Sequence, residues 1–314
     1  MAIEPNQKYS LYGLTIAVVG AGRIGAELIR NLGLMGLGRI GVFERDRRVA
    51  DPLRNRYSVH DGDFWDTLTL ARLQGYDFAV CTVDDQATRL RMNRKCLVAN
   101  VNLVQAWTED SLAIVGAYPF GALAESACFE CETSRAPVPL PIATLKLSVE
   151  AAPTASATRI ATASVAGALA AALIARIAAG SHGAVARRAT LDATLGQGSS
   201  FEIRRDPHCP RCGSLQRPVP IVQARNRWEV PAAVAEMCPE MLNQRLQLSD
   251  DIEGLPVESC CVRELATRFH GGPVPAKFAL TEFSGRIVCL DFEEFGPDAE
   301  PATARASAHR HPNG

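Results

Sequence analysis

The chain has 314 residues, of which 47% are hydrophobic and 21% charged, and its formal net charge is -1. This is the composition of an ordinary globular protein with room for one large domain and a smaller one. The near-zero charge argues against an electrostatic nucleic-acid binder, which would carry a basic excess.

The chain opens with a pattern of strand, turn, helix and strand. Residues 14–19 predict a buried strand, 20–25 a tight turn, 26–35 a helix and 39–44 a second strand. A unit of this kind requires a parallel sheet with a right-handed crossover, so we expect an α/β fold.

Further strands and helices follow along the chain. Residues 76–85 predict a third strand ending in paired carboxylates, 86–99 a helix, 102–121 further strands and 189–206 an extended pair. The run 161–180 is rich in alanine and interrupted by Arg176, which favours a buried helix over a membrane span.

The sequence changes in character after residue 218. Residues 219–296 predict a small α+β domain, with helices over 239–248 and 262–272 and a hairpin turning at Ser284 and Gly285. Residues 297–314 are rich in Pro, Ala, Ser and His and are predicted to be a disordered tail. The predicted organisation is therefore 1–218, 219–296 and 297–314.

The first turn contains Gly20, Gly22 and Gly25 at the G-x-G-x-x-G spacing, directly after a strand. Glycines there let backbone N–H groups approach a phosphate, and an acid about 20 residues later accepts ribose hydroxyls. Glu44, with Asp46 two residues beyond it, lies at that place. The pattern predicts a nucleotide site, although a nicotinamide-dependent oxidoreductase, or a turn that serves packing only, would show the same motif.

Cysteines form two Cys-x-x-Cys pairs. Four thiolates are the complement of a closed, structural zinc site, and a redox pair is the weaker alternative. With ten cysteines and no recognisable signal peptide, we expect a reducing, cytoplasmic setting. Cys81, Cys96 and Cys289 are predicted to be core residues, and the paired ones are Cys128, Cys131, Cys209 and Cys212.

A series of motifs follows along the chain: the glycine turn, the acid, "CTVDDQATRLRMNRKC", "YPFG", "CFEC", the Ala-rich helix and "PHCPRCG". In this order the motifs resemble the ThiF/MoeB adenylyltransferase family, which includes the ubiquitin-activating enzymes. The resemblance covers residues 12 to 214. The most specific part of the resemblance is the block "CTVDDQATRLRMNRKC". The residues in it that resemble the family's pattern are Asp84, Asp85, Arg89, Asn93 and Cys96.

The resemblance implies a Rossmann-like, mostly parallel sheet with helices on both faces that binds ATP and Mg²⁺. It implies transfer of AMP to the C-terminal carboxylate of a ubiquitin-like or sulfur-carrier protein, or of a precursor peptide, by a homodimer. From charge and composition we expect no nucleic-acid and no membrane partner. The three glycines would line the phosphates, Glu44 would hold the ribose, and Asp84 would face Mg²⁺ and the triphosphate. Asp46 and Arg89 would be further nucleotide-binding residues. Zn²⁺ would be held by the four paired cysteines.

The sequence also departs from the family pattern. Arg23 replaces a glycine, the catalytic lysine and the N-terminal arginine have no counterpart, and Arg54 or Arg56 is the expected stand-in, unless both belong to a solvated loop. Asp84 could instead cap the helix that follows it, and Arg89 could be a structural ion-pair residue.

The alternative function is a catalytically degenerate relative that binds a peptide or protein for a partner enzyme. Residues 132–208 contain no cysteine, so we expect adenylation without a thioester step. Cys260 and Cys261 are the remaining candidate nucleophiles, although a structural role is the favoured interpretation. The domain over 219–296 is expected to recognise the partner.

Overall fold

We describe the protein from a computed structural model. The structure describes residues 11–133, 154–180 and 185–223 except 210, 214 and 216, and then residue 236 and the strands at 245–248, 258–261, 278–283 and 286–291. The chain divides into two compact units, Met1–Pro218 and Val219–Gly314.

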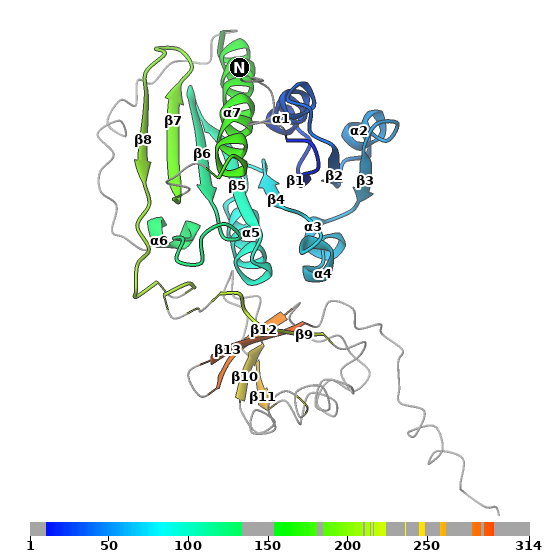
Figure 1. Cartoon of the computed structure of the whole chain (residues 1–314). Coiled ribbons are helices and arrows are strands. Elements are labelled where there is room, and N and C mark those ends of the chain that lie inside the picture. Colours follow the sequence, from blue (N-terminus) through cyan, green and yellow to red (C-terminus); the bar gives the residue numbers. More distant parts are fainter. Residues whose placement is uncertain are drawn as a thin grey trace, which may run out of the picture. The chain divides into compact units, whose positions relative to one another are not determined.

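The first unit is built on an eight-stranded sheet with the order β3-β2-β1-β4-β5-β6-β7-β8. Its strands β3, β2, β1, β4 and β5 run parallel, and β6, β7 and β8 continue the sheet antiparallel. The bounds are β1 Thr15–Val19, β2 Arg39–Glu44, β3 Ser58–Asp61, β4 Phe78–Cys81, β5 Asn102–Glu109, β6 Leu112–Tyr118, β7 Arg187–Asp192 and β8 Gly198–Glu202. The predicted α/β, Rossmann-like fold class is confirmed (Figure 1).

Helices α1 (Arg23–Leu34) and α7 (Thr154–Ala178) pack together on one face of the sheet (Figure 1). They share a buried cluster with alternate residues of the strands, such as Val18, Val42 and Val104. Helix α5 (Gln86–Ala99) contacts β4 and β5, and its buried Met92 and Cys96 lie outside that cluster. Because strand side chains alternate between faces, α5 covers the opposite face.

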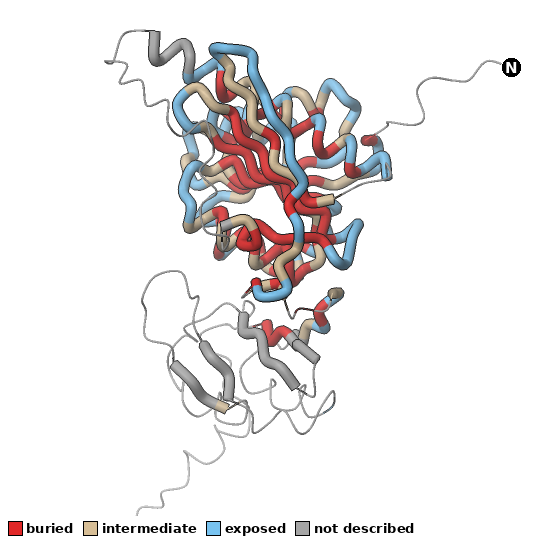
Figure 2. Tube along the Cα trace, turned by 90° about the vertical axis from the view of Figure 1, so that its left-hand side faces the viewer, coloured by how far each residue is buried: buried red, intermediate tan, exposed pale blue. Residues whose placement is uncertain are grey.

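The Ala-rich helix is a core helix, as predicted. Arg159–Ala178 is long and apolar enough to cross a membrane by composition, but half of its most apolar window is buried in the protein. Small residues such as Ala166 and Ala170 allow close packing, and Figure 2 shows how burial concentrates in the interior of this unit.

Several predicted elements need correction. The prediction missed β3, a four-residue edge strand whose residues are all at least partly exposed. The strand predicted over 76–85 is the fourth in the chain and ends at Cys81, and α1 begins at Arg23 because Gly22 already occupies its N-cap. The remaining short helices are α2 Arg47–Ala50, the 3-10 turn η1 Asp51–Leu53, α3 Phe64–Thr67, α4 Leu70–Leu73 and α6 Phe129–Thr133.

The second unit contains two small sheets, β12-β13-β9 and β10-β11. The predicted hairpin is confirmed as β12 (Phe278–Phe283) paired antiparallel with β13 (Arg286–Asp291), and β9 is Ile221–Gln223. The helix predicted over 239–248 is wrong at its end, because β10 (Arg245–Leu248) pairs with β11 (Glu258–Cys261). Leucines two residues apart fit a strand, so pairing overrides helix propensity.

Other sequence-based predictions on this unit lie outside the described residues. These are the helix over 262–272 and the tail over 297–314. Cys261 and its neighbour Cys260 lie in β11, in register with Arg245 and Leu246.

Candidate functional site

The three glycines of the first turn have different roles. Gly20 has a φ of +87°, and a Cβ on Gly25 would lie 2.2 Å from the Gly20 carbonyl oxygen, so both positions exclude other residues. A Cβ on Gly22 would meet nothing within 4 Å, and this residue is the N-cap of α1. The turn therefore brings backbone N–H groups at a helix N-terminus to an open surface, as phosphate binding requires.

Glu44 connects the end of β2 to this turn. Its carboxylate accepts hydrogen bonds from the backbone N–H groups of Ala21, at 2.7 Å, and Asp46, at 2.9 Å. Each oxygen keeps lone-pair capacity for a further donor such as a ribose hydroxyl. Asp46 itself caps α2, accepts from the Arg48 backbone and pairs with the Arg48 guanidinium, which lowers the pKa of Asp46.

Asp84 is not a helix cap. The N-cap of α5 is Asp85, whose side chain accepts from the Thr88 N–H at 2.7 Å. Hydrogen bonds from the Thr88 side chain and backbone lower the pKa of Asp85, and the exposed Asp84 carboxylate stays outside the cap. The capping alternative for Asp84 is therefore wrong.

Arg89 positions the loop that carries Asp84. It is 8% exposed, donates from Nη1 to the Asp84 carbonyl at 2.8 Å, and stacks over the Trp107 ring at 4.6 Å. Burial lowers the pKa of Arg89, and no ion pair involving it occurs in the described part of the chain. It acts as a structural residue through carbonyl bonds rather than through an ion pair.

A cavity of about 500 Å³ lies between Gly22 of the glycine turn and Asp84, at the carboxyl ends of the parallel strands. The order of strands reverses between β1 and β4, and open α/β sheets bind their ligands at such a point. Strand β5 extends four residues past Gln105, its last partner of β4, and so carries its end over this edge. The lining residues are Gly22, Arg23, Ile24, Thr82, Asp84, Thr108, Asp110, Arg159 and Ala163.

Sequence reasoning missed three charged residues of this cavity. Asp110 occupies the two-residue turn between β5 and β6 with a φ of 52°, and the "TEDSL" turn was a usable signal. Arg23 was noticed only as a departure from the glycine pattern. Arg159 lies on α7, far away in the sequence, and no pattern pointed to it.

The two arginines predicted to support catalysis are placed differently. Arg54 bonds Asp51 at 2.9 Å and also pairs with Asp61 at the carboxyl end of β3, which lowers the pKa of Asp61. Its guanidinium is thus already engaged by two carboxylates near the predicted ribose site.

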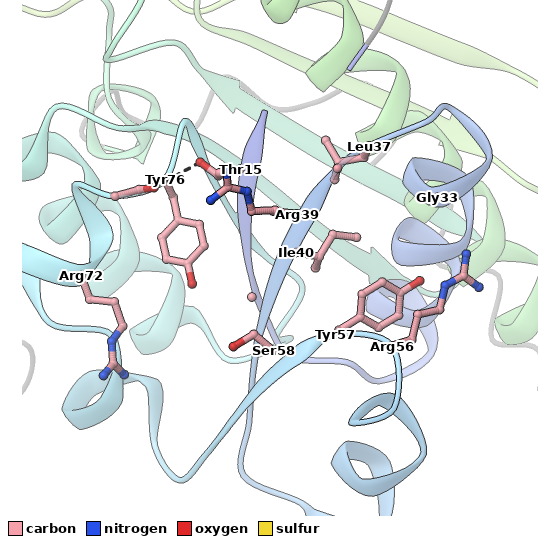
Figure 3. Close-up of a pocket in the computed structure, with 13 residues that line it drawn as sticks. Thr15, Gly33, Leu37, Arg39, Ile40, Arg56, Tyr57, Ser58, Arg72 and Tyr76 are labelled. Carbon is pink, nitrogen blue, oxygen red and sulfur yellow. Dashed lines mark hydrogen bonds between the residues drawn. The ribbon is translucent and has the colours of Figure 1, made fainter. Parts of the chain in front are cut away.

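Arg56 lies at the opposite edge of the sheet. It lines a second cavity of about 550 Å³ together with Thr15, Arg39 and Ser58, the first residues of β1, β2 and β3. Figure 3 shows Arg56 beside Tyr57 and across this cavity from Arg72. The structure therefore does not bring Arg56 together with Gly22 and Asp84.

The four paired cysteines converge. Their sulfur atoms all lie within 4.8 Å of one another, with separations of 3.9 Å between Cys128 and Cys131, 3.7 Å between Cys128 and Cys209 and 3.2 Å between Cys131 and Cys212. A tetrahedral zinc with bonds of about 2.3 Å needs sulfurs roughly 3.8 Å apart. All four side chains are buried, so the residues fit a closed structural zinc site.

The surroundings of the cysteines suit thiolates. Hydrogen bonding from Cys128 lowers the pKa of Cys131, and the Asp206 N–H donates to the Cys131 sulfur at 3.5 Å. Arg205 bonds the Cys212 carbonyl at 2.6 Å, and burial lowers the pKa of the neighbouring Arg217 to about 10. The cysteines predicted as core, Cys81, Cys96 and Cys289, are fully buried, and burial raises the pKa of Cys81 to about 11.

Asn93 and Glu130 join the cysteine cluster to the sheet. The Asn93 side chain accepts from the Phe129 N–H at 2.9 Å and donates to Glu130 at 3.4 Å. Glu130 also pairs with Arg94 of α5 and with Arg211, which lies between Cys209 and Cys212. The helix that begins after Asp84 is thereby fixed to both cysteine pairs.

No protein-family model matches the chain. Over 145 residues it is 24% identical to the SUMO-activating enzyme subunit uba-2 of Caenorhabditis elegans, covering 37% of this chain and 24% of that protein. Over 165 residues it is 24% identical to SUMO-activating enzyme subunit 2 of Dictyostelium discoideum, covering 43% and 24%. The chain thus matches only about a quarter of the length of these relatives.

Among solved structures, the chain is matched to E. coli MccB at low identity. MccB with AMPCPP and MccA gives a TM-score of 0.49 at 19% identity, over 66% of this chain and 68% of that chain. MccB with ATP gives a TM-score of 0.47 at 19% identity, over the same shares.

Proposed function

We propose that this chain is an ATP-dependent adenylyltransferase. Its resemblance to the ThiF/MoeB family is confirmed by its similarity to SUMO-activating enzyme subunits and by its four-cysteine cluster. It activates the C-terminal carboxylate of a small ubiquitin-like or sulfur-carrier protein, or of a precursor peptide. The observation that carries the proposal is that the helix N-terminus at Gly22 and the exposed Asp84 line the same cavity.

The chemistry joins two anions. A carboxylate oxygen of the acceptor attacks the α-phosphate of ATP, a new phosphorus–oxygen bond forms, and the bond to pyrophosphate breaks. The barrier falls when positive charge and N–H groups meet the charge on the phosphates. Mg²⁺, when bound, neutralises phosphate charge and aligns the leaving group.

The residues of this chain divide the task. The glycine turn directs backbone N–H groups to the phosphates, Glu44 is positioned to accept ribose hydroxyls, and Asp84 would hold Mg²⁺. Arg89 keeps Asp84 in place through the loop carbonyl. The cysteine cluster would hold Zn²⁺ and serve stability only, because four thiolate ligands leave no coordination position open for a substrate.

The relatives support the class of acceptor. By name they are subunits of SUMO-activating enzymes, and a small protein acceptor is proposed here for this chain. The domain after residue 218 is proposed to recognise that acceptor. The homodimer and the cytoplasmic location stay predictions.

Pyrophosphate exchange into ATP in the presence of candidate acceptors tests the proposal. Asp84→Asn should lower exchange by about 100-fold, because a metal ligand contributes several kcal/mol in such a site. Asp85→Asn is the matched control, since it removes the same charge one residue away and asparagine still caps a helix. Equal rates for the two variants, or no ATP binding by the wild type, would refute the proposal.

A second candidate function is a binding module for a partner enzyme. It is favoured by the engagement of Arg54 with Asp51 and Asp61 and by Lys95, which is fully buried and donates to the Trp65 and Leu68 carbonyls. Neither cation is free for a phosphate. Calorimetry with ATP and Mg²⁺ separates the two functions, because the binding module predicts no heat from nucleotide.

A further inference from the structure

Two arginines from distant parts of the sequence line the cavity that contains Asp84. Arg23 is the first residue of α1, and Arg159 lies in the first part of α7. Both side chains are exposed, and neither forms an ion pair within the residues that the structure describes. The cavity therefore holds two guanidinium groups that no described carboxylate neutralises through an ion pair.

Helix packing fixes where these arginines lie. A Cβ on Gly167 of α7 would lie 2.9 Å from the Ile24 carbonyl and 2.9 Å from the Leu28 nitrogen of α1, so the helices meet backbone to backbone. Arg159 lies one helical turn before Ala163, and both residues line the cavity. The contact at Gly167 therefore brings the Arg159 side chain of α7 to the N-terminal end of α1.

We infer that Arg23 and Arg159 bind the polyphosphate of ATP and supply the positive charge that the family pattern assigns to other residues. The inference rests on the proposed function for its ligand. A guanidinium group matches phosphate oxygens with two parallel N–H donors, and it stays charged at every physiological pH. Arg23 follows Gly22, so its side chain extends the phosphate-binding turn that the helix N-terminus begins.

The charge pattern of the cavity separates two tasks. Asp84 and Asp110 offer oxygen ligands to a divalent cation, and the two arginines offer donors to phosphate oxygens. Arg54 and Lys95 are already held by carboxylates or carbonyls, and Arg56 lies at the other edge of the sheet. Of these cationic residues, Arg23 and Arg159 are therefore the ones placed in the cavity to bind phosphate oxygens.

Calorimetric titration of the full chain with Mg²⁺–ATP and, separately, with inorganic tripolyphosphate tests this inference. Arg23→Gln and Arg159→Gln should each weaken binding of both probes about 10-fold, as expected for loss of one charged hydrogen-bonding group. The matched control is Arg39→Gln, which makes the same charge change in the cavity at the opposite edge and should stay within about twofold of wild type.

The outcomes separate this inference from the proposed function. If both arginine variants bind the probes as tightly as Arg39→Gln does, or if the wild type binds neither probe, the inference is wrong. If tripolyphosphate binding depends on both arginines but no acceptor supports pyrophosphate exchange, the inference stands and the adenylation proposal fails. If Asp84→Asn alone abolishes exchange and the arginine variants behave as the control, adenylation stands without them.

Discussion

Glu130 is the residue through which we expect the cysteine cluster to stabilise the sheet. It is 8% exposed and lies between Cys128 and Cys131. One carboxylate oxygen accepts from Arg211 at 3.0 Å, and the other accepts from Arg94 at 3.4 Å. Glu130→Gln keeps the shape of the side chain but removes the charge and turns one acceptor into a donor that faces a guanidinium.

The magnitude follows from these two bonds. A buried hydrogen bond to a charged group contributes about 1.5–3 kcal/mol, and glutamine retains one neutral acceptor. We expect a loss of about 2 kcal/mol in the free energy of unfolding. For a unit of this size that corresponds to a fall in Tm of roughly 4–8 °C.

The assay is urea unfolding of the zinc-loaded protein followed by circular dichroism, with zinc release to a chelator measured in parallel. Glu202→Gln is the matched control, because Glu202 pairs with Arg187 at a similar distance of 2.9 Å but its side chain is 60% exposed. Exposed pairs contribute about 0–1 kcal/mol. If Glu130→Gln costs no more than Glu202→Gln, and zinc leaves both at the wild-type rate, Glu130 does not couple the cluster to the sheet.

Three further predictions follow from the same structure. Gly25→Ala should lower stability by about 3 kcal/mol, since its Cβ would lie 2.2 Å from the Gly20 carbonyl oxygen, whereas Gly22→Ala should cost about 0.5–1 kcal/mol; equal unfolding midpoints would contradict this reading of the turn. Burial and nearby Arg72 lower the pKa of His60, so the unfolded chain takes up the proton first as the pH falls below about 6.5, and the folded state loses stability. The variant His60→Phe, whose ring can still stack on Phe43, should therefore lose less stability than the wild type between about pH 7 and 5. Equal losses of stability in the two proteins would exclude this effect. The purified chain should contain one zinc, and its removal should lower the Tm, whereas an unchanged Tm in metal-free protein would show that the cysteines need no metal.

Local patterns in the sequence were enough to predict most of the first sheet. Short apolar runs such as 14–19 and 78–81, bounded by turn residues, favour buried strands over helices, and a glycine turn between strand and helix favours a parallel neighbour. The edge strand β3 escaped because "SVHD" has no apolar run: an edge strand pairs on one side only, and polar residues are tolerated there.

The candidate site could also be predicted only in part from the sequence. The spacing of the cysteines was sufficient to predict that Cys128 and Cys131 meet Cys209 and Cys212, because two Cys-x-x-Cys pairs supply the four thiolates that suit a structural zinc site. The sequence could not distinguish Asp84 from Asp85 as the helix cap, because both precede the same helix. Only the hydrogen bond from Thr88 to Asp85 decided this.

What the sequence by itself determined is therefore local: the glycine turn, the apolar strands and the cysteine pairs, whose residue types allow few alternatives. The tertiary structure decided which charges meet. It engaged Arg54 with two aspartates, placed Arg56 at the far edge and brought Arg159 into the same cavity as Arg23 through the close contact at Gly167. The physical reason is that an arginine has no periodicity or spacing that reveals its partner, so its role depends on the packing of helices that are far apart in the sequence.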